Sequence, residues 1–468
     1  MIRYYIVIDI VGLEFDHLQS GIIPNISQIA SEGEGAKMEP VFPAVTCTVQ
    51  ASLLSGAYPS QHGIIGNGLY DRSNHNVSFW EQSSGLVETD RVWDVAAQNG
   101  HKPAESTNNV STTLSASATA SPVFKTAVLF WQNTMYCRAN IVVTPRPLHF
   151  DDGMVMWCYS KPIGYYDEQL ERKFGEFNLA TYWGPFASHK SSEWITQATT
   201  YTLEEHRPNL LFTYIPHIDY SAQKYGKGSS QVRDDLKIAD GMVEKIVQKT
   251  IDLGIKDESQ FVILSEYGFN DVSSAIALNL KLRDAGLIAT RLIHDKEYLD
   301  YEFSNAFAVV DHQIAHIYVK NGFISQTKQA LENVTGVDRL LYGEEKKLLK
   351  IDHERSGDIV AISDKDKWFS YYWWYEPERA PIFAKNVDIH RKPGYDPVEL
   401  FIDRKTRSIS QDTGLVNGSH GRLANPTTEE GLALYVSNRK SGILKNNNSG
   451  DSVKAVDIGK YLMSLVSY

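Results

Sequence analysis

The feature that most constrains the fold is a set of short, almost wholly apolar runs rich in β-branched and aromatic residues. The clearest runs span residues 4–10, 125–131, 209–215 and 260–264. Such runs are typical of strands that are covered on both faces in a parallel sheet. Segments with helical spacing of apolar residues separate them, most clearly residues 234–253. This alternation predicts an α/β protein with a doubly wound, mostly parallel sheet and helices on both faces.

The pattern changes after residue 272. Residues 273–417 contain mixed short strands and many aromatic residues, including the run at 368–383. We interpret that run as a buried strand in preference to a stacking platform for a planar leaving group. Residues 453–466 have the pattern of a last amphipathic helix, and residues 445–451 that of an exposed loop. The sequence therefore predicts a core formed by residues 1–272 and 418–468, with an inserted cap at 273–417.

The charge and the cysteine content limit which partners and which cellular compartment we expect for this protein. The chain has 46 basic and 57 acidic residues, a net charge of -11, which disfavours binding to duplex nucleic acid. Its three cysteines are too scattered for a disulfide framework, and residues 1–12 read as a strand, not as a signal peptide. No apolar run reaches about 18 residues, the length of a membrane span. We therefore expect a cytoplasmic protein without a membrane segment, and the sequence leaves its oligomeric state open.

Three carboxylates stand at or just beyond the ends of predicted strands. Asp9 lies in the first run, Asp219 follows the third, and Glu266 follows the fourth. Because the ligand crevice of an open parallel sheet lies beyond the carboxyl ends of its strands, these acids should converge on one negative pocket. Converging carboxylates indicate a bound cation.

A hydroxyl-rich turn leads into an apolar helix that begins near Cys47, and Thr46 lies at its N-terminus. Free backbone N–H groups and the helix dipole favour an anionic group at this position. A hydroxyl coordinated to a metal loses its proton more readily and becomes a nucleophile. Helix capping is the alternative role for Thr46, and Cys47 and Thr48 are rival nucleophiles.

Together with Asp9, this segment resembles the type I phosphodiesterase/nucleotide pyrophosphatase family of the alkaline phosphatase superfamily. The family pattern is a nucleophilic threonine, a Gly-x-Tyr-Pro turn, a His-Gly-Ile step and an asparagine. The residues that fill it are Thr46, Gly56, Tyr58, Pro59, His62, Gly63 and Asn67. The strings PHIDYSAQKYG, LSEYG and GSHG are similar to the family's later metal-binding motifs.

The resemblance implies an alkaline-phosphatase-like fold and a covalent phospho-enzyme on Thr46. It implies that Asn67 donates a hydrogen bond to a phosphoryl oxygen. It also implies two divalent metal ions, zinc in the family. One ion would be held by Asp219, residue 223 and His420, and the other by Asp9, Thr46 and residues 266 and 267.

Three of these positions depart from the family pattern. Gln223, Glu266 and Tyr267 stand where the pattern has histidine, aspartate and histidine. Fewer nitrogen ligands and more oxygen ligands favour Mn²⁺ or Mg²⁺ over zinc. Gln223 and Tyr267 either act as ligands themselves or are replaced by other side chains.

Three histidines are candidate replacements. His217 would share a side with Asp219 on an extended segment. His312 would reach the pocket if the strand at 314–319 runs antiparallel to its neighbours. His390 lies in a turn whose Lys392 would bring a positive charge to the substrate.

The predicted function is a metal-dependent phosphoric ester hydrolase of the phosphodiesterase or nucleotide pyrophosphatase type, which acts on a small phosphorylated substrate through a phospho-threonine. A phosphonate or phosphomonoester hydrolase of the same superfamily is the first alternative. A catalytically degraded protein that only binds a phosphorylated ligand is the second, and a phosphoryl transferase is the third.

Overall fold

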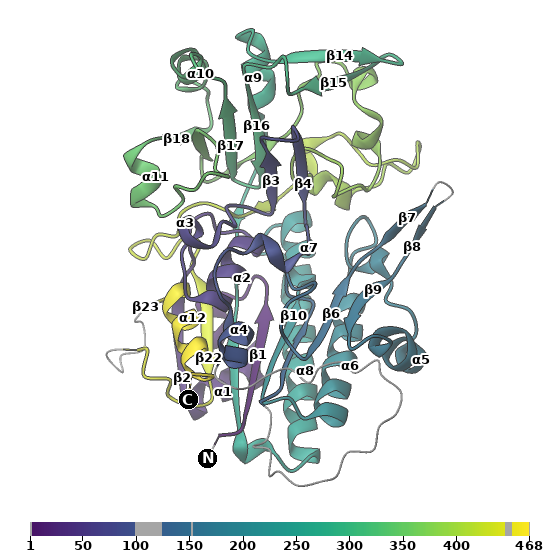
Figure 1. The fold of residues 1–468 in the computed structure, drawn as a ribbon, viewed down its shortest axis with the longest axis vertical. Coiled ribbons are helices and arrows are strands. Elements are labelled where there is room, and N and C mark those ends of the chain that lie inside the picture. Colours follow the sequence, from purple (N-terminus) through teal and green to yellow (C-terminus); the bar gives the residue numbers. More distant parts are fainter. Residues whose placement is uncertain (1, 99–123, 151–152, 445–451, 468) are drawn as a thin grey trace.

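A computed structural model describes residues 2–98, 124–150, 153–444 and 452–467 (Figure 1). Its centre is a nine-stranded sheet. The strands follow the order β23 (Ser452–Lys454), β2 (Glu34–Glu39), β22 (Ala433–Ser437), β11 (Ser259–Leu264), β1 (Tyr4–Ile10), β10 (Leu210–Ile215), β5 (Thr126–Leu129), β6 (Ile141–Pro145) and β9 (Cys158–Lys161). The four apolar runs all form strands of this sheet.

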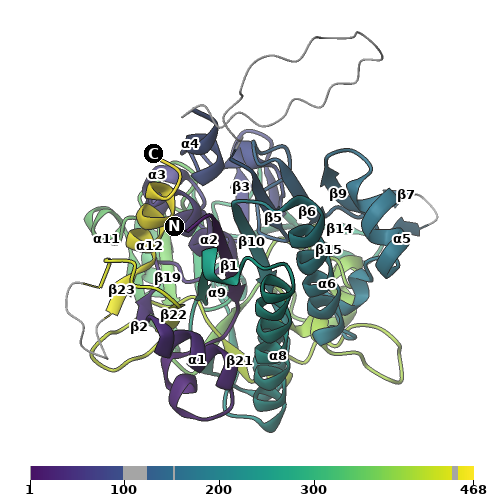
Figure 2. The same cartoon turned by 90° about the horizontal axis from the view of Figure 1, so that it is seen from below.

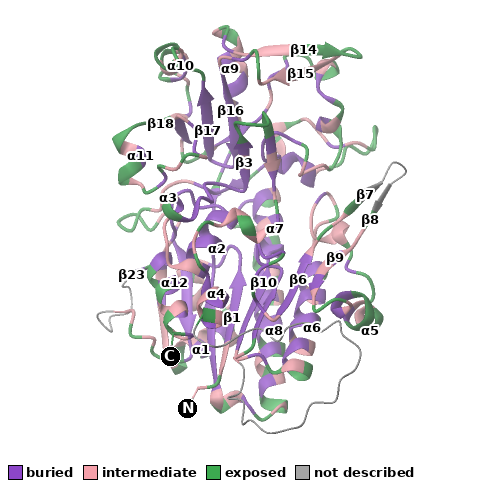
Figure 3. Cartoon of the chain, in the orientation of Figure 1, coloured by how far each residue is buried: buried purple, intermediate pink, exposed green. Residues whose placement is uncertain are grey.

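The sheet is mostly parallel. β11, β1, β10, β5 and β6 run in one direction, whereas β22 and β9 are antiparallel to their neighbours. Every residue of β10 and β11 is buried, as expected for strands covered on both faces (Figure 3). Figure 2 shows one helical layer on each side. One layer holds α1 (Pro24–Glu32), α6 (His189–His206) and α8 (Ser230–Asp252), and the other holds α2 (Thr46–Ser55), α4 (Val92–Gln98) and α12 (Ala455–Ser464).

Helix α12 packs closely against helix α2. A Cβ atom added to Gly459 of α12 would lie 2.4 Å from the backbone oxygen of Ser52, so only glycine permits this approach. Gly56 ends α2 with a φ of +66°, and a Cβ there would lie 2.9 Å from the backbone nitrogen of Lys460. This tight crossing fixes the helix whose first residue is Thr46.

A second, smaller sheet lies beyond the carboxyl edge of the first (Figure 1). It contains β16 (Ala306–Asp311), β17 (Ile314–Val319), β19 (Ile359–Ser363) and β18 (Val337–Leu341), all paired antiparallel. A buried apolar cluster of its own supports it. The hairpin of β3 (Gly68–Asp71) and β4 (Asn76–Phe79) packs against it from the N-terminal part of the chain.

The aromatic run at 368–383 contributes to this second core. Trp368, Tyr371, Trp373 and Trp374 are buried, which confirms the prediction of a buried segment. Only its start forms a strand, β20 (Lys367–Ser370), which pairs with β13 (Ser274–Ala277). The predicted loop at 445–451 lies outside the described residues. Within the described parts of the chain, no helix has the length and apolar character needed to cross a membrane.

Candidate active site

The three strand-end carboxylates come to one edge of the main sheet. β1 lies between β10 and β11 and runs parallel to both, with Asp9 opposite Tyr214 and Leu264. Asp219 lies in the first turn of α7 (His217–Tyr225), which directly follows β10, and Glu266 follows β11 by two residues. The structure therefore brings together the acids that the strand pattern singled out.

Asp9 and Glu266 form a buried carboxylate pair beside Thr46. Glu266 lies next to Asp9, Thr46 and Gln50, but neither of its oxygens makes a hydrogen bond of normal geometry. Asp9 accepts from Gln50 Nε2 at 3.0 Å through Oδ2, and its Oδ1 is also unpaired. Burial raises the pKa of Asp9 to about 7, and burial together with the Asp9 charge raises that of Glu266. Three unpaired buried carboxylate oxygens beside a hydroxyl match the ligands that hard divalent cations prefer.

Thr46 is the first residue of α2, and it is the member of the trio 46–48 that lines the adjoining cavity. Its Oγ1 lies 3.0 Å from the hydroxyl of Tyr267. The rival Cys47 is a poor nucleophile, because burial raises the pKa of its thiol well above the usual range. Thr48 is wholly buried inside the helix layer. The geometry thus favours Thr46 among the three candidates.

Asn67 is clamped between α2 and the second sheet. Its Oδ1 accepts from the Cys47 backbone N–H at 2.9 Å. Its own backbone N–H donates to Asp311 Oδ2 at 2.7 Å, and its Nδ2 donates to Asp311 Oδ1 at 3.1 Å. Asp311 is not among the residues that the sequence pattern singled out. The structure shows that it orients the asparagine next to Thr46.

Around Asp219 the predicted ligands are arranged differently. Gln223 donates from Nε2 to Asp219 Oδ2 at 2.8 Å, and its Oε1 accepts from the Tyr395 hydroxyl at 2.9 Å. His420 donates from Nδ1 to the Ala44 carbonyl at 2.8 Å. Its Nε2 is unpaired and lies 3.8 Å from Asp219 Oδ1, which is also unpaired. The side-chain amide nitrogen and oxygen of Gln223 therefore both have hydrogen-bond partners already.

Four aromatic rings stack in a row beside Asp219, and we call them the ring stack: Tyr267, His420, His312 and Tyr395. The centroid distances along the row are 3.6, 3.8 and 3.6 Å. Asp311 orients His312 through a contact of 2.8 Å between Asp311 Oδ1 and Nδ1. Burial lowers the pKa values of both histidines well below the usual range, which keeps the two imidazoles neutral.

The three candidate replacement histidines have different outcomes. His217 was predicted to share an extended segment with Asp219, and this is wrong, because it begins helix α7 and its ring contacts Ser192 Oγ and the Asp235 carbonyl. His312 does line the cavity. It arrives by the turn between β16 and β17 of the second sheet, not by a strand of the main sheet.

The turn that carries His390 also differs in part from expectation. His390 lines the cavity, and its Nδ1 lies 3.2 Å from the Phe79 carbonyl. Lys392 was expected to face the substrate, but its side chain is fully buried. It forms ion pairs of 2.8 Å with Asp396 and 2.6 Å with Glu399. Lys392 therefore stabilises the turn and does not contact the cavity.

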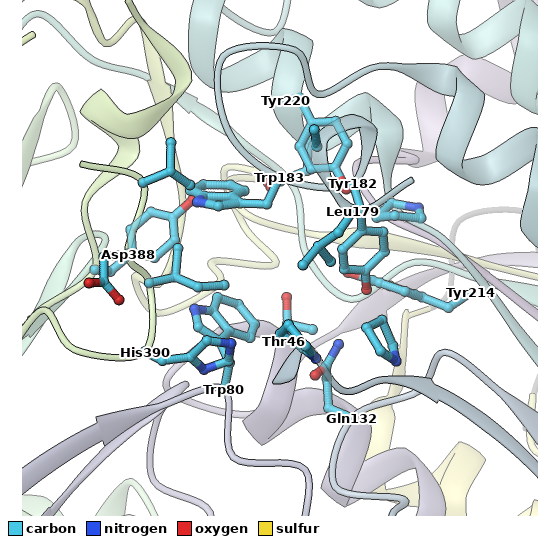
Figure 4. Close-up of a pocket in the computed structure, with 18 of the residues that line it drawn as sticks. Thr46, Trp80, Gln132, Leu179, Tyr182, Trp183, Tyr214, Tyr220, Asp388 and His390 are labelled. Carbon is cyan, nitrogen blue, oxygen red and sulfur yellow. The ribbon is translucent and has the colours of Figure 1, made fainter. Parts of the chain in front are cut away.

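A cavity of about 380 Å³ opens above Thr46 and Asp219 (Figure 4). Figure 4 shows aromatic side chains on several sides of Thr46. They include Trp80, Tyr182, Trp183, Tyr214 and Tyr220. The indole of Trp183 is fixed by a hydrogen bond of 2.6 Å to Glu399. Trp80, Tyr182 and Trp183 lie in loops and short turns without periodicity, whereas Tyr214 lies in β10 and Tyr220 in α7, where the pattern indicated burial and not a cavity wall. The run at 368–383 contributes none of the lining.

The pKa values of the acids predict how stability depends on pH when metal is removed. Burial raises the pKa values of Asp9 and Asp219 to about 7, above about 3.9 in an unfolded chain. These two carboxyls therefore bind more protons in the folded protein between these values, and their contribution to the free energy of unfolding falls as pH rises through this window, whereas buried neutral histidines such as His312 and His420 contribute with the opposite sign. The slope is up to about 1.4 kcal/mol per pH unit for each carboxyl. The contribution of Asp219 is the difference in free energy of unfolding between the wild type and Asp219→Asn, measured by denaturant unfolding at pH 5, 6 and 7 with a chelator present.

The Asp219→Asn variant is the control for this prediction. It removes one of the two titrating carboxyl groups, so its stability should fall less steeply with pH than that of the wild type. Equal slopes for the wild type and Asp219→Asn would contradict the assignment.

Comparisons with known sequences agree with this geometry. The family model described as "Type I phosphodiesterase / nucleotide pyrophosphatase" matches residues 5–396. The ectonucleotide pyrophosphatase/phosphodiesterase family member 1 of Homo sapiens is 25% identical over 279 residues, 58% of this chain and 24% of that protein. An uncharacterized pyrophosphatase/phosphodiesterase of Schizosaccharomyces pombe is 20% identical over 281 residues, 57% of this chain and 45% of that protein. The matches thus span less than half the length of these relatives.

Two solved structures share the fold. Murine ectonucleotide pyrophosphatase/phosphodiesterase 5 superposes with a TM-score of 0.61 at 14% identity, covering 99% of this chain and 95% of that one. Phosphonoacetate hydrolase from Sinorhizobium meliloti, in complex with phosphonoformate, has a TM-score of 0.61 at 16% identity, covering 99% and 96%. They confirm the expected alkaline-phosphatase-like α/β fold. Because the family model extends over most of the sequence, the chain belongs to the type I phosphodiesterase/nucleotide pyrophosphatase family.

Proposed function

We propose that the protein is a phosphoric ester hydrolase that acts through a covalent phospho-threonine on Thr46. The observation that carries this proposal is the position of the Thr46 hydroxyl. It lies at the N-terminus of a buried helix, opens on the cavity, and stands beside the unpaired Asp9–Glu266 pair. The printed names of the relatives, pyrophosphatases and phosphodiesterases, support the same class of reaction.

A divalent cation held by Asp9, Glu266 and Thr46 would neutralise the two carboxylates and lower the pKa of the threonine hydroxyl. Mn²⁺ or Mg²⁺ suits this oxygen-only set better than zinc. Thr46 Oγ1 gives up its proton and forms a bond to phosphorus while the bond from phosphorus to one alcohol breaks, and that alcohol leaves with a proton. Water then adds to phosphorus and breaks its bond to Thr46 Oγ1, which regains a proton, so that a diester is released as its phosphomonoester. Amides in the first turn of α2 and the Asn67 side chain hold the phosphoryl oxygens.

The cavity indicates the kind of ester. Its aromatic walls suit a planar or apolar organic group. Among the described residues that line it are Asp219 and Asp388, but no lysine or arginine. A pyrophosphate would place a second anionic group here without a cationic partner. We therefore favour a diester with a single phosphate, and a small phosphorylated molecule as the partner.

The test is turnover after metal exchange. The protein is stripped with a chelator, reconstituted with Mn²⁺, Mg²⁺ or Zn²⁺ singly, and assayed with an aryl phosphodiester, an aryl phosphomonoester and an aryl phosphonate. We expect diester turnover that depends on Mn²⁺ or Mg²⁺. Faster turnover of the monoester or the phosphonate would move the assignment to that class. A folded protein that binds phenyl phosphate but turns over none of the esters would be a binding protein.

Asp311 should act as a positioning residue for this reaction. In Asp311→Ala, Asn67 loses both carboxylate contacts, so its amide is held at the N-terminus of α2 only by the hydrogen bond from the Cys47 backbone N–H. We expect kcat to fall by roughly tenfold to a hundredfold with little change in KM, because misplaced groups near the reacting atoms lower the rate. Asp352→Ala, at an exposed aspartate of the same inserted region, should keep wild-type kcat. An unchanged kcat in folded Asp311→Ala would rule out this role.

A further inference from the structure

The family pattern implies two metal ions, but we propose that this chain binds one. The single cation lies at Asp9, Glu266 and Thr46, and the ring stack stands in place of the second site. This inference rests on the cation of the proposed function, and it concerns how many ions the chain holds and which residues exclude the other.

The residues of the second site leave too few free ligands. Gln223 uses its amide nitrogen on Asp219 Oδ2 and its oxygen on the Tyr395 hydroxyl. What remains is Asp219 Oδ1 and His420 Nε2, which lie 3.8 Å apart without hydrogen-bond partners. Catalytic metal sites normally have at least three protein ligands. Two atoms alone do not make such a site.

No neighbour supplies the third ligand. His312 is the nearest imidazole, but its ring lies tilted against that of His420 with the centroids 3.8 Å apart, and with Nδ1 engaged by Asp311 only its Nε2 is left as a possible ligand. Tyr267 stacks on the other face of His420 at a centroid distance of 3.6 Å, and its hydroxyl is already engaged with Thr46 Oγ1 at 3.0 Å. Within the ranges that the structure describes, no three His, Cys, Asp or Glu side chains gather in a way that could hold an ion.

The Asp9–Glu266 pair, in contrast, has several free ligand atoms. Both side chains are fully buried, and three of their four oxygens have no hydrogen-bond partner. Two unpaired carboxylates in a dry site are costly unless they share a proton or bind a cation. The Thr46 hydroxyl beside them adds a further oxygen ligand. A cation is therefore expected at the Asp9–Glu266 pair.

Two of the three departures from the family pattern, Tyr267 and Gln223, are linked through the ring stack. Tyr267 forms one end and contacts Thr46 Oγ1 with its hydroxyl at 3.0 Å. Tyr395 forms the other end and donates to Gln223 at 2.9 Å. Stacked rings and two phenol hydroxyls thus connect Thr46 with Gln223, one residue from each of the two metal sites that the family pattern implies. The site keeps a defined geometry without the second cation.

The test is the number of ions bound by the full chain. The protein is stripped with a chelator and equilibrated by dialysis with Mn²⁺, and the bound metal is counted by elemental mass spectrometry. We expect one Mn²⁺ per chain and a rise in melting temperature on loading. Two ions per chain would overturn the inference. No bound ion would overturn it together with the cation of the proposed function.

Two variants locate the ion. Glu266→Gln should lose the bound Mn²⁺ and the rise in melting temperature, whereas Asp219→Asn should keep both. The reverse pattern would place the ion at the other site and overturn the inference. The count is independent of turnover. An inactive protein that holds one ion keeps the inference and removes the proposed hydrolysis, and an active protein that holds two does the opposite.

A double variant tests which residues exclude the second ion. Gln223→His with Tyr267→His breaks the ring stack and provides two imidazoles, so we expect two Mn²⁺ or Zn²⁺ ions per chain. A folded double variant that still binds one ion would show that these residues are not the cause. Its folding is checked by its melting transition, and Tyr267→His alone, which adds no third ligand beside Asp219 and His420, should remain at one.

Discussion

Replacement of Thr46 by alanine is expected to reduce turnover of an aryl phosphodiester by roughly a thousandfold or more, the size of effect seen when a nucleophile is removed. Thr46 is the residue that combines a hydroxyl on the cavity wall with the N-terminus of a buried helix. An alanine methyl group leaves the helix and the cavity intact but cannot form a bond to phosphorus. The measurement is kcat/KM for both proteins after metal reconstitution.

The matched control is Thr48→Ala, two positions later in the same helix. The Thr48 hydroxyl is buried and makes no hydrogen bond, so its removal should leave turnover close to wild type. Acid quenching during turnover of the diester should trap the phosphoryl group, with its remaining ester group, on the wild-type peptide that contains Thr46, and peptide mass spectrometry detects the added mass. Full activity of Thr46→Ala would mean that the reaction does not proceed through this threonine.

The sequence was most informative where the structure is repetitive. Strands covered on both faces must be apolar throughout, so the runs at 4–10 and 260–264 revealed β1 and β11 directly. Parallel neighbours end at the same edge, so Asp9 and Glu266 could be placed together without knowledge of any contact. Both inferences depend on local pattern and on a general rule of sheet geometry.

Long-range contacts were not predictable in this way. Asp311 ends β16, Asn67 precedes β3, and the two are 244 positions apart, so no spacing relates them. The ring stack likewise collects residues from the β11 loop, the β16–β17 turn and the segment near 420. His217 was misplaced because the chain turns into α7 immediately after Pro216, and the extended segment assumed for it does not exist.

The wall of the cavity was missed for a related reason. Trp183 follows a short 3₁₀ turn, where aromatic residues carry no periodic signal of burial or exposure. What fixes it is Glu399, which also accepts from the Asp388 backbone N–H at 2.9 Å and pairs with Lys392. Because Lys392 lies two residues after His390 in the sequence, it was expected to contact the substrate. Its partners at 396 and 399 could be recognised only once the turn had folded back on itself.

Lys392→Met is therefore expected to lower the free energy of unfolding by about 3–5 kcal/mol, the usual cost of breaking a buried ion pair from one side. The Lys392 side chain is fully buried, and so are its two partners, Asp396 and Glu399. Burial alone would lower the pKa of Lys392, but the two carboxylates together raise it, so the lysine is charged in the folded protein. Methionine fills a similar volume without the charge and leaves two buried anions side by side.

The pH dependence of this loss separates lost charge from lost packing. Without the lysine, burial and the neighbouring Asp396 charge should raise the pKa of Glu399 further above its unfolded value, so the variant gains protons on folding. Its deficit relative to wild type should then be larger at pH 8 than at pH 5, measured by denaturant unfolding. Lys190→Met, at an exposed position of α6, should change stability by less than about 0.5 kcal/mol at either pH. A deficit for Lys392→Met that does not depend on pH would mean that packing, and not the ion pair, holds this wall of the cavity in place.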